Sequence, residues 1–209
     1  MINDRIKDWA RGLVTPLVRV LARLGFTPNG LTLIGVALNG VVAIIIGAGF
    51  EFWGGVGLLL ASAFDTLDGT LARVTGQDSR FGAFFDSNMD RLAEVLVYGG
   101  LLYHYAHRGA TLESLLVFAA LTGSLLVSYA RARAEGLGFE CAVGLFARPE
   151  RIILLALALI VNPIAARLGL QFDLLALALA IIALGAHFTA WQRILHVYHA
   201  DHRVSGFEG

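Results

Sequence analysis

The sequence predicts an all-α, polytopic membrane protein with six transmembrane helices and an N-terminal amphipathic helix at the membrane interface. Of its 209 residues, 57% are hydrophobic and only 15% are charged, and the mean hydropathy is +0.71. Soluble domains of this length are usually far less apolar. Apolar runs long enough to cross a hydrocarbon core of about 30 Å recur along the chain. No segment between these runs is long enough for a second domain, so we expect one domain over 1–209.

Residues 1–27 are predicted to form a helix that lies in the cytoplasmic interface. Apolar side chains recur on roughly one face of this helix, at Ile6, Trp9, Leu13, Leu17, Val20 and Leu21. Basic side chains fall elsewhere and would reach anionic head groups. An alternative is that the segment is a charged lead-in to the first span. Pro28 fits the opening of the next helix and Thr27 can cap it.

A six-helix bundle is predicted at 28–198, and 199–209 are predicted to be a cytoplasmic tail. The expected transmembrane helices are 29–50, 53–74, 81–106, 111–134, 149–169 and 173–198. Gly and Ala are abundant in them, as expected where helices pack closely in lipid. The charged, amphipathic N-terminus does not resemble a cleavable signal.

Lys and Arg are distributed unevenly between the two sides of the predicted bundle. Thirteen lie on the side that holds both termini, against two, Arg108 and Arg167, on the other. Because positive charge is retained in the cytoplasm, both termini are expected there, in a multi-pass protein of the cell (inner) membrane. The net charge of zero gives no sign of a nucleic-acid partner, and none is expected.

Four carboxylates interrupt the apolar pattern of the second and third predicted spans, at Asp65, Asp68, Asp86 and Asp90. Asp65 and Asp68 share one face near the cytoplasmic end of the second span, and Asp86 and Asp90 share one near the start of the third. Since these helices are consecutive and antiparallel, the acids lie at matched depth and can converge. Each would cost several kcal/mol in apolar surroundings without a cation. Hard oxygen ligands in this number suit Mg²⁺ or Mn²⁺, as a pair of ions.

The residues beside the acids suggest a bulky, phosphorylated ligand. Gly69 and Gly82 leave space against the backbone, and Arg73 can reach a phosphate. Pairing the acids with Arg73 and Arg91 would leave two charges unbalanced. An ion or metabolite transporter is a non-enzyme alternative, because intramembrane acids also mark transport pathways. It is less favoured because the acids cluster near one membrane face.

The spacing D-x2-D-G-x2-A-R-x8-G-x3-D-x3-D from Asp65 to Asp90 resembles the signature of the CDP-alcohol phosphotransferases (CDP-alcohol phosphatidyltransferases). The resemblance covers essentially the whole chain. It implies that an alcohol attacks the β-phosphorus of a CDP-linked lipid such as CDP-diacylglycerol and releases CMP. It also implies a metal site with a catalytic base at Asp90, and the homodimer common in the family. The implied metal ligands are Asp65, Asp68, Asp86 and Asp90. The candidate CDP-lipid contacts are Asn29, Gly30, Leu31, Thr32, Gly69, Ala72, Arg73, Ser79 and Gly82.

The acceptor alcohol is predicted from arginines around the loop that joins the fourth and fifth spans. Clustered guanidinium groups suit an acceptor that carries a phosphate, although positive charge on the cytoplasmic side alone explains some of them. The sequences S-Y-A-R-A-R-A-E at 128–135 and R-P-E-R at 148–151 resemble bacterial phosphatidylinositol phosphate synthases, which use 1D-myo-inositol 3-phosphate. The resemblance implies that the phosphate is bound by Arg131, Arg151 and Arg193, with Arg133 and Arg148 as further candidates. Phosphatidylglycerol phosphate synthase, which uses glycerol 3-phosphate, is the alternative.

Overall fold

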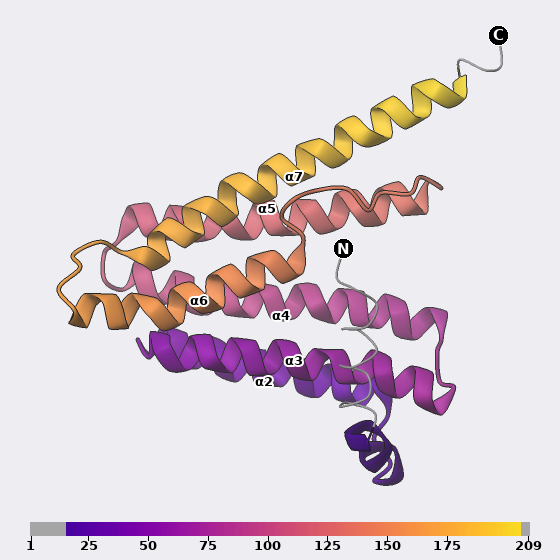
Figure 1. Ribbon diagram of the computed structural model, residues 1–209, viewed down its shortest axis with the longest axis horizontal. Helices are drawn as coiled ribbons and strands as arrows, with labels where there is room; N and C mark the ends of the chain where they lie inside the picture. The colour runs from indigo at the N-terminus through magenta and orange to yellow at the C-terminus, as the bar shows by residue number, and fades with distance from the viewer. Residues whose placement is uncertain (1–15, 206–209) are drawn as a thin grey trace.

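The computed structural model of the protein describes residues 16–205 and the side chains of residues 16–202. This part of the chain is helical and contains no strand, in agreement with the predicted all-α class. A helical segment at 16–23 precedes the long helices. These are α2 (Pro28–Gly47), α3 (Glu51–Thr75), α4 (Arg80–Ala106), α5 (Thr111–Gly136), α6 (Arg148–Arg167) and α7 (Leu174–Ser205) (Figure 1).

The ends of the helices follow local signals in the sequence. The Thr27 side chain accepts a hydrogen bond from the Gly30 N–H at 3.1 Å and Pro28 occupies the first turn of α2, which confirms the predicted cap. Ser79 caps α4 in the same way through Gly82, at 2.9 Å. α3 ends at Gly76, whose φ of +66° is left-handed. The short turn between Gly76 and Ser79 reverses the chain direction from α3 to α4, and both helices pack against α2.

Each of the six long helices packs against two others. α2 packs against α3 and α4, α3 against α6, and α5 against α7, while α4 contacts α5 and α6 contacts α7. Two close approaches require glycine. A Cβ added to Gly100 of α4 would lie 2.3 Å from the Ala43 carbonyl oxygen of α2, and one on Gly55 of α3 would lie 2.7 Å from that of Ala156 in α6. Small residues thus let the backbones approach, as in lipid-embedded bundles.

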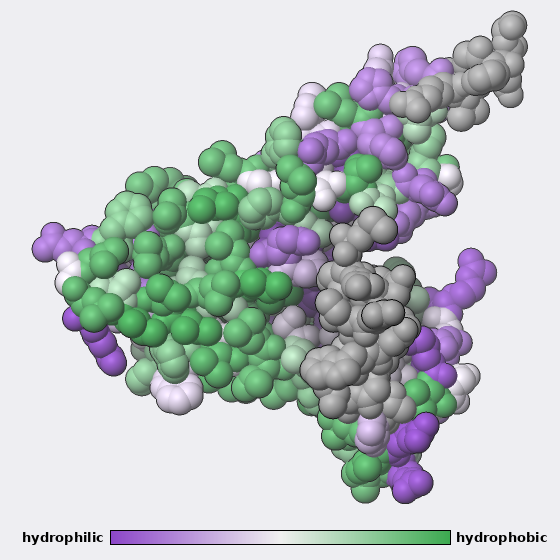
Figure 2. Space-filling model, in the orientation of Figure 1, coloured by the Kyte–Doolittle hydropathy of each residue, from purple (hydrophilic) through white to green (hydrophobic). Residues whose placement is uncertain are grey.

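Four of these helices are long and apolar enough to cross a membrane: α2, α5, α6 and Leu174–His202 of α7. α3 and α4, with 25 and 27 residues, do not meet the same test of composition, and they carry the acids at 65–90. The six-span count therefore stays a prediction. Hydrophobic residues cover most of the face in Figure 2, whereas hydrophilic residues gather toward its right side, where α3 meets α4 and α7 ends.

Two predicted boundaries lie near the ends of the described part of the chain. The interfacial helix was expected over 1–27, and its first fifteen residues lie outside the described part of the chain. The remainder docks against α2 and α3, because Val18 is fully buried against Leu31, Leu67 and Leu71. The tail predicted at 199–209 is instead helical as far as Ser205. No Gly or Pro interrupts the end of α7 before Gly206, so nothing in the sequence stops the helix earlier.

Candidate functional site

Three of the four predicted carboxylates converge at one end of the bundle. Asp65 and Asp68 of α3 and Asp86 of α4 each offer one carboxylate oxygen, and these oxygens lie within 4.8 Å of one another. The spacing of three residues on α3 and the antiparallel turn to α4 produce this geometry. We call Asp65, Asp68 and Asp86 the carboxylate triad. Its all-oxygen, anionic donor set fits Mg²⁺ or Mn²⁺.

α2 supports the carboxylate triad from the side. The Thr32 hydroxyl donates a 2.6 Å hydrogen bond to Asp68 Oδ2, and both residues are buried. One turn further along α2, Gly35 faces Asp65, and a Cβ there would lie 3.7 Å from Asp65 Oδ1. Groups that hydrogen-bond a metal ligand fix its orientation and tune its affinity for the ion. Thr32, predicted to contact the nucleotide, therefore also orients a predicted metal ligand.

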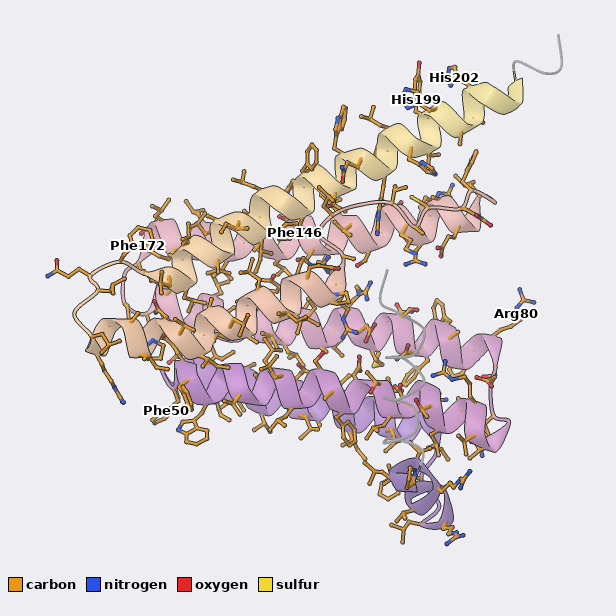
Figure 3. All side chains as sticks on the ribbon, in the orientation of Figure 1. Phe50, Arg80, Phe146, Phe172, His199 and His202 are labelled. Carbon is orange, nitrogen blue, oxygen red and sulfur yellow. The ribbon has the colours of Figure 1, made fainter. Side chains whose placement is uncertain are left out.

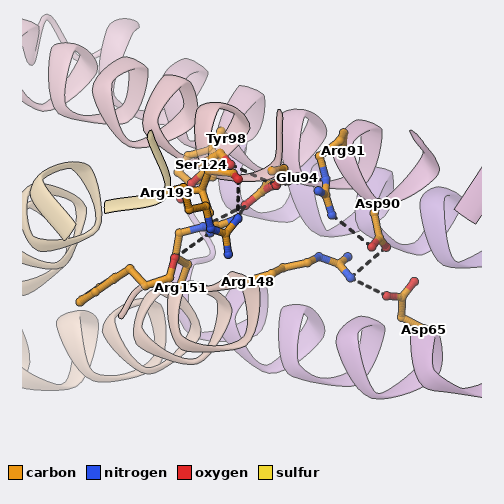
Figure 4. A network of polar contacts seen from close by, with 12 residues as sticks. Asp65, Asp90, Arg91, Glu94, Tyr98, Ser124, Arg148, Arg151 and Arg193 are labelled. Atoms are coloured by element: carbon orange, nitrogen blue, oxygen red, sulfur yellow. Dashed lines mark hydrogen bonds and ion pairs between the residues drawn. The ribbon is translucent and has the colours of Figure 1, made fainter. Parts of the chain in front are cut away.

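Asp90 lies outside the carboxylate triad, one turn further along α4. Its Oδ1 is 2.8 Å from Arg148 Nη1, and the same nitrogen donates to Asp65 Oδ2 at 2.9 Å (Figure 4). Arg91 Nη2 approaches Asp90 Oδ2 at 3.3 Å. Arg148 begins α6, and Pro149 in that first turn fixes where the helix starts. The structure thus connects the predicted catalytic base to the triad through an arginine.

A cavity of about 830 Å³ opens beside the triad, between the start of α2, the end of α3 and the start of α4. Asp68 and Asp86 line it. Seven of the nine predicted CDP-lipid contacts also line it, namely Asn29, Thr32, Gly69, Ala72, Arg73, Ser79 and Gly82. Gly69 faces open space, since a Cβ there would meet no other atom within 4 Å. The volume is within the range of small-molecule and cofactor sites, about 300–1,000 Å³.

The remaining two predicted contacts, Gly30 and Leu31, do not line the cavity. The Gly30 N–H is used in the cap of α2, and Leu31 is buried in the apolar cluster with Val18. Among side chains that sequence reasoning did not name, Gln77, Asp78 and Arg80 line the rim. Figure 3 shows Arg80 extending from the start of α4, at the opposite end of the bundle from Phe50 and Phe172.

The predicted acceptor arginines fall into two groups. Arg131 and Arg133 are exposed at the end of α5, and Arg131 Nε donates to Glu135 Oε1 at 2.7 Å. Arg131 borders a separate cavity of about 420 Å³, together with Glu140 and Cys141. By contrast, Arg148, Arg151 and Arg193 point into the interior and bind protein groups.

Arg151 and Arg193 are almost completely buried, with 1% and 4% of their surface exposed. Arg151 donates to Glu94 Oε1 through Nη2 at 2.8 Å and to the Phe146 carbonyl through Nη1 at 3.0 Å. Arg193 donates from Nε to the Val143 carbonyl at 2.9 Å and from Nη1 to the Val127 carbonyl. Arg193 therefore ties the loop before α6 to α5 and α7, a role that its position in the sequence did not indicate.

Sequence reasoning missed Glu94, which joins this network from α4 (Figure 4). Glu94 is buried and lies four residues beyond Asp90, which itself follows Asp86 by four. Positions four residues apart lie on the same face of a helix. Extending the stripe of acids by one further turn would therefore have identified Glu94 as facing the site.

Comparison with known proteins gives a consistent result. The sequence model of the CDP-alcohol phosphatidyltransferase family matches residues 26–200. The chain is 35% identical over 184 residues to the phosphatidylinositol phosphate synthase of Mycobacteroides abscessus, covering 87% of this chain and 82% of that protein. It is 38% identical over 159 residues to the archaetidylinositol phosphate synthase of Pyrococcus horikoshii, covering 71% and 79%.

Solved structures are similar as well. The crystal structure of Mycobacterium tuberculosis phosphatidylinositol phosphate synthase with CDP-DAG bound superposes with a TM-score of 0.80 at 30% sequence identity, covering 88% of this chain and 93% of that one. The structure of the same protein in complex with manganese and citrate gives a TM-score of 0.78, covering 88% of each chain.

Proposed function

Because the chain belongs to the CDP-alcohol phosphatidyltransferase family, we propose that it transfers the phosphatidyl group of CDP-diacylglycerol to 1D-myo-inositol 3-phosphate. The products are phosphatidylinositol phosphate and CMP. The observation that carries the proposal is the carboxylate triad beside a cavity of about 830 Å³. The bacterial and archaeal relatives are named as synthases of phosphatidylinositol phosphate and archaetidylinositol phosphate, and a product that contains inositol phosphate supports this acceptor.

In the proposed reaction, the acceptor hydroxyl attacks the β-phosphorus. The bond from that phosphorus to the oxygen bridging the two phosphates breaks, and CMP leaves with the electron pair. Asp90 takes the proton of the hydroxyl. When bound at the triad, with Asp90 as a further ligand, Mg²⁺ or Mn²⁺ ions would offset the charge that develops on the pyrophosphate oxygens. Arg73 has no acidic partner among the described residues, so its guanidinium is available to a phosphate of the donor.

The proposal includes the arrangement of the helices in the membrane. α3 and α4 complete a six-helix bundle, with the triad and both termini on the cytoplasmic side of the cell membrane. The excess of Lys and Arg on that side supports the orientation. The length of α3 and α4 and their packing against α2 support the span count. The homodimer stays a prediction.

The test is an acceptor panel with the purified protein in detergent or lipid. CMP release from CDP-diacylglycerol is measured with Mg²⁺ and, in turn, inositol 3-phosphate, glycerol 3-phosphate, inositol and serine. We expect release with inositol 3-phosphate and little with the two alcohols that lack phosphate. Preference for glycerol 3-phosphate would reject inositol 3-phosphate as the acceptor but would support the same type of reaction. Activity only with an unphosphorylated alcohol would reject the role given to the arginines.

A transporter makes a different prediction for the same preparation. In sealed liposomes it would move an ion or metabolite across the membrane without forming CMP. Flux with no CMP release from CDP-diacylglycerol, under any acceptor of the panel, would reject the enzymatic function.

A further inference from the structure

Glu94 is bound to Arg151 in the interior of the bundle. Glu94 Oε1 accepts two hydrogen bonds from this arginine, from Nη2 at 2.8 Å and from Nε at 3.3 Å. The side chains are 7% and 1% exposed. With the bond from Nη1 to the Phe146 carbonyl, three of the five guanidinium N–H groups of Arg151 have fixed partners. The two left over lie one on Nη1 and one on Nη2, so the guanidinium keeps a donor on each terminal nitrogen for a phosphate.

Stability alone does not account for this pair. Removing two charges from water costs more than their attraction commonly returns, and well-packed apolar residues of similar size are often at least as stable. A charged pair in this position therefore points to a functional requirement for the guanidinium. The carboxylate then serves to hold that guanidinium in one orientation.

The surroundings of Glu94 also contain polar atoms without a hydrogen-bond partner among the described residues. They are Glu94 Oε2, Arg91 Nε and Arg148 Nε. Glu94, Arg148 and Arg151 line a small cavity of about 30 Å³, enough for a water molecule. Glu94 Oε2 lies 4.0 Å from Arg91 Nε, and Arg91 contacts the predicted base Asp90. Glu94 therefore stands between the arginine predicted to bind the acceptor and the residues around the base.

From this arrangement we propose that Glu94 is a positioning residue for acceptor recognition: it orients Arg151 so that the free N–H groups of the guanidinium bind the phosphate of the acceptor alcohol. The inference rests on the proposed function. It assigns no contact between Glu94 and the acceptor itself. It predicts that Glu94 affects the acceptor and leaves the CDP-lipid side of the site unchanged, because that side is formed by α2, α3 and the start of α4.

The test measures the KM of each of the two substrates separately. In Glu94→Gln, the side chain keeps its size but loses the charge that fixes Arg151. We expect the KM for the phosphorylated acceptor to rise at least about 10-fold, as for loss of a charge-assisted hydrogen bond. The KM for CDP-diacylglycerol and the affinity for Mn²⁺ should stay within about 2-fold. The matched control is Glu150→Gln, which removes the same charge from an exposed side chain adjacent to Arg151 and should behave like wild type.

A double-mutant cycle covers the possibility that Glu94→Gln weakens the fold. If Glu94 acts through Arg151, then Glu94→Gln combined with Arg151→Met should raise the acceptor KM no further than Arg151→Met alone. An unchanged acceptor KM in Glu94→Gln, equal losses for both substrates, or additive losses in the double variant would each overturn the inference. Absence of CMP release by the wild-type protein with any phosphorylated acceptor would instead reject the proposed function.

Discussion

Arg73, which lines the cavity between α2, α3 and α4, has no acidic partner among the described residues, whereas three arginines of α6 and α7 are bound to carboxylates and carbonyl groups. On the cavity side, the only hydrogen bond of the Arg73 side chain within the described residues is a 3.5 Å contact with the Thr70 hydroxyl. On the other side, Arg148, Arg151 and Arg193 each have partners within 3 Å. We call the cavity between α2, α3 and α4 the donor side, and the region around Arg148, Arg151 and Arg193 the arginine side.

The difference indicates how each side accepts a ligand. Among the described residues the donor-side cavity is already formed, so we expect a CDP group to enter it without displacing contacts between them. On the arginine side, an anion must share guanidinium groups that already have partners. Changes on the donor side should therefore affect ligand and metal binding, while changes to buried arginines should also affect folding. Arg148 joins the two sides, since it contacts both Asp65 and Asp90.

The largest expected effect comes from Asp90, at the boundary between the sides. In Asp90→Asn the carboxylate that takes the proton is lost, and we expect CMP release to fall about 100- to 10,000-fold. At least one Mn²⁺ ion should still bind, because the carboxylate triad does not include Asp90. CMP release and Mn²⁺ binding are measured on the same preparation. Near-normal turnover would exclude Asp90 as the base, and complete loss of Mn²⁺ binding would make Asp90 essential to the metal site.

A smaller effect is expected on the donor side from Thr32→Val, which keeps the shape of the side chain and removes the 2.6 Å hydrogen bond to Asp68. Loss of such support for a metal ligand typically weakens binding about 10- to 100-fold. The Mg²⁺ concentration that gives half-maximal CMP release should rise accordingly, with the maximal rate largely recovered at high Mg²⁺.

Thr66→Val is the matched control for this change. Thr66 is exposed on α3, and its hydroxyl donates a hydrogen bond to the Ala63 carbonyl of the same helix at 2.7 Å. This variant should keep the wild-type Mg²⁺ dependence. The same dependence in Thr32→Val would show that the hydroxyl does not orient Asp68.

The sequence was informative where local spacing determines the geometry. Asp65 and Asp68 share a helical face because of helix periodicity, and a short turn returns the chain to Asp86, so the convergence of these three acids could be predicted from local sequence. The family resemblance located most of the cavity lining. Gly30 and Leu31 lie outside it because the cap of α2 and the apolar cluster around Val18 use those residues.

The arginine side could not be predicted in the same way. Arg148 meets Asp65 across 83 residues of sequence, and Arg151 meets Glu94 across 57. These contacts depend on how α6 docks against α3 and α4, which no local pattern encodes. A cluster of arginines on the predicted cytoplasmic side looks uniform in the sequence, yet the fold leaves Arg131 exposed and buries Arg151. Arginines that only set the membrane orientation and arginines that bind a ligand cannot be told apart in the sequence, because both produce a cluster of positive charge on the same side.

The smallest expected effect is that of an exposed arginine on stability, which distinguishes exposed arginines from buried ones. The Arg131–Glu135 pair is exposed, with side chains 52% and 46% accessible, so Arg131→Ala should change the free energy of unfolding by less than about 1 kcal/mol. Arg151→Ala would leave Glu94 buried without its partner, at a cost of about 3–5 kcal/mol. Unfolding in detergent measures both, with Arg167→Ala as a control far from the site.

The acceptor KM of the same variant then tests the role that resemblance gives to Arg131. If its guanidinium binds the phosphate, Arg131→Ala raises the acceptor KM while stability stays near that of wild type, because an exposed arginine can contact a ligand without supporting the fold. An unchanged KM would assign Arg131 to the positive cytoplasmic surface and leave recognition to the buried arginines. A stability loss as large as that of Arg151→Ala would contradict the distinction between exposed and buried pairs.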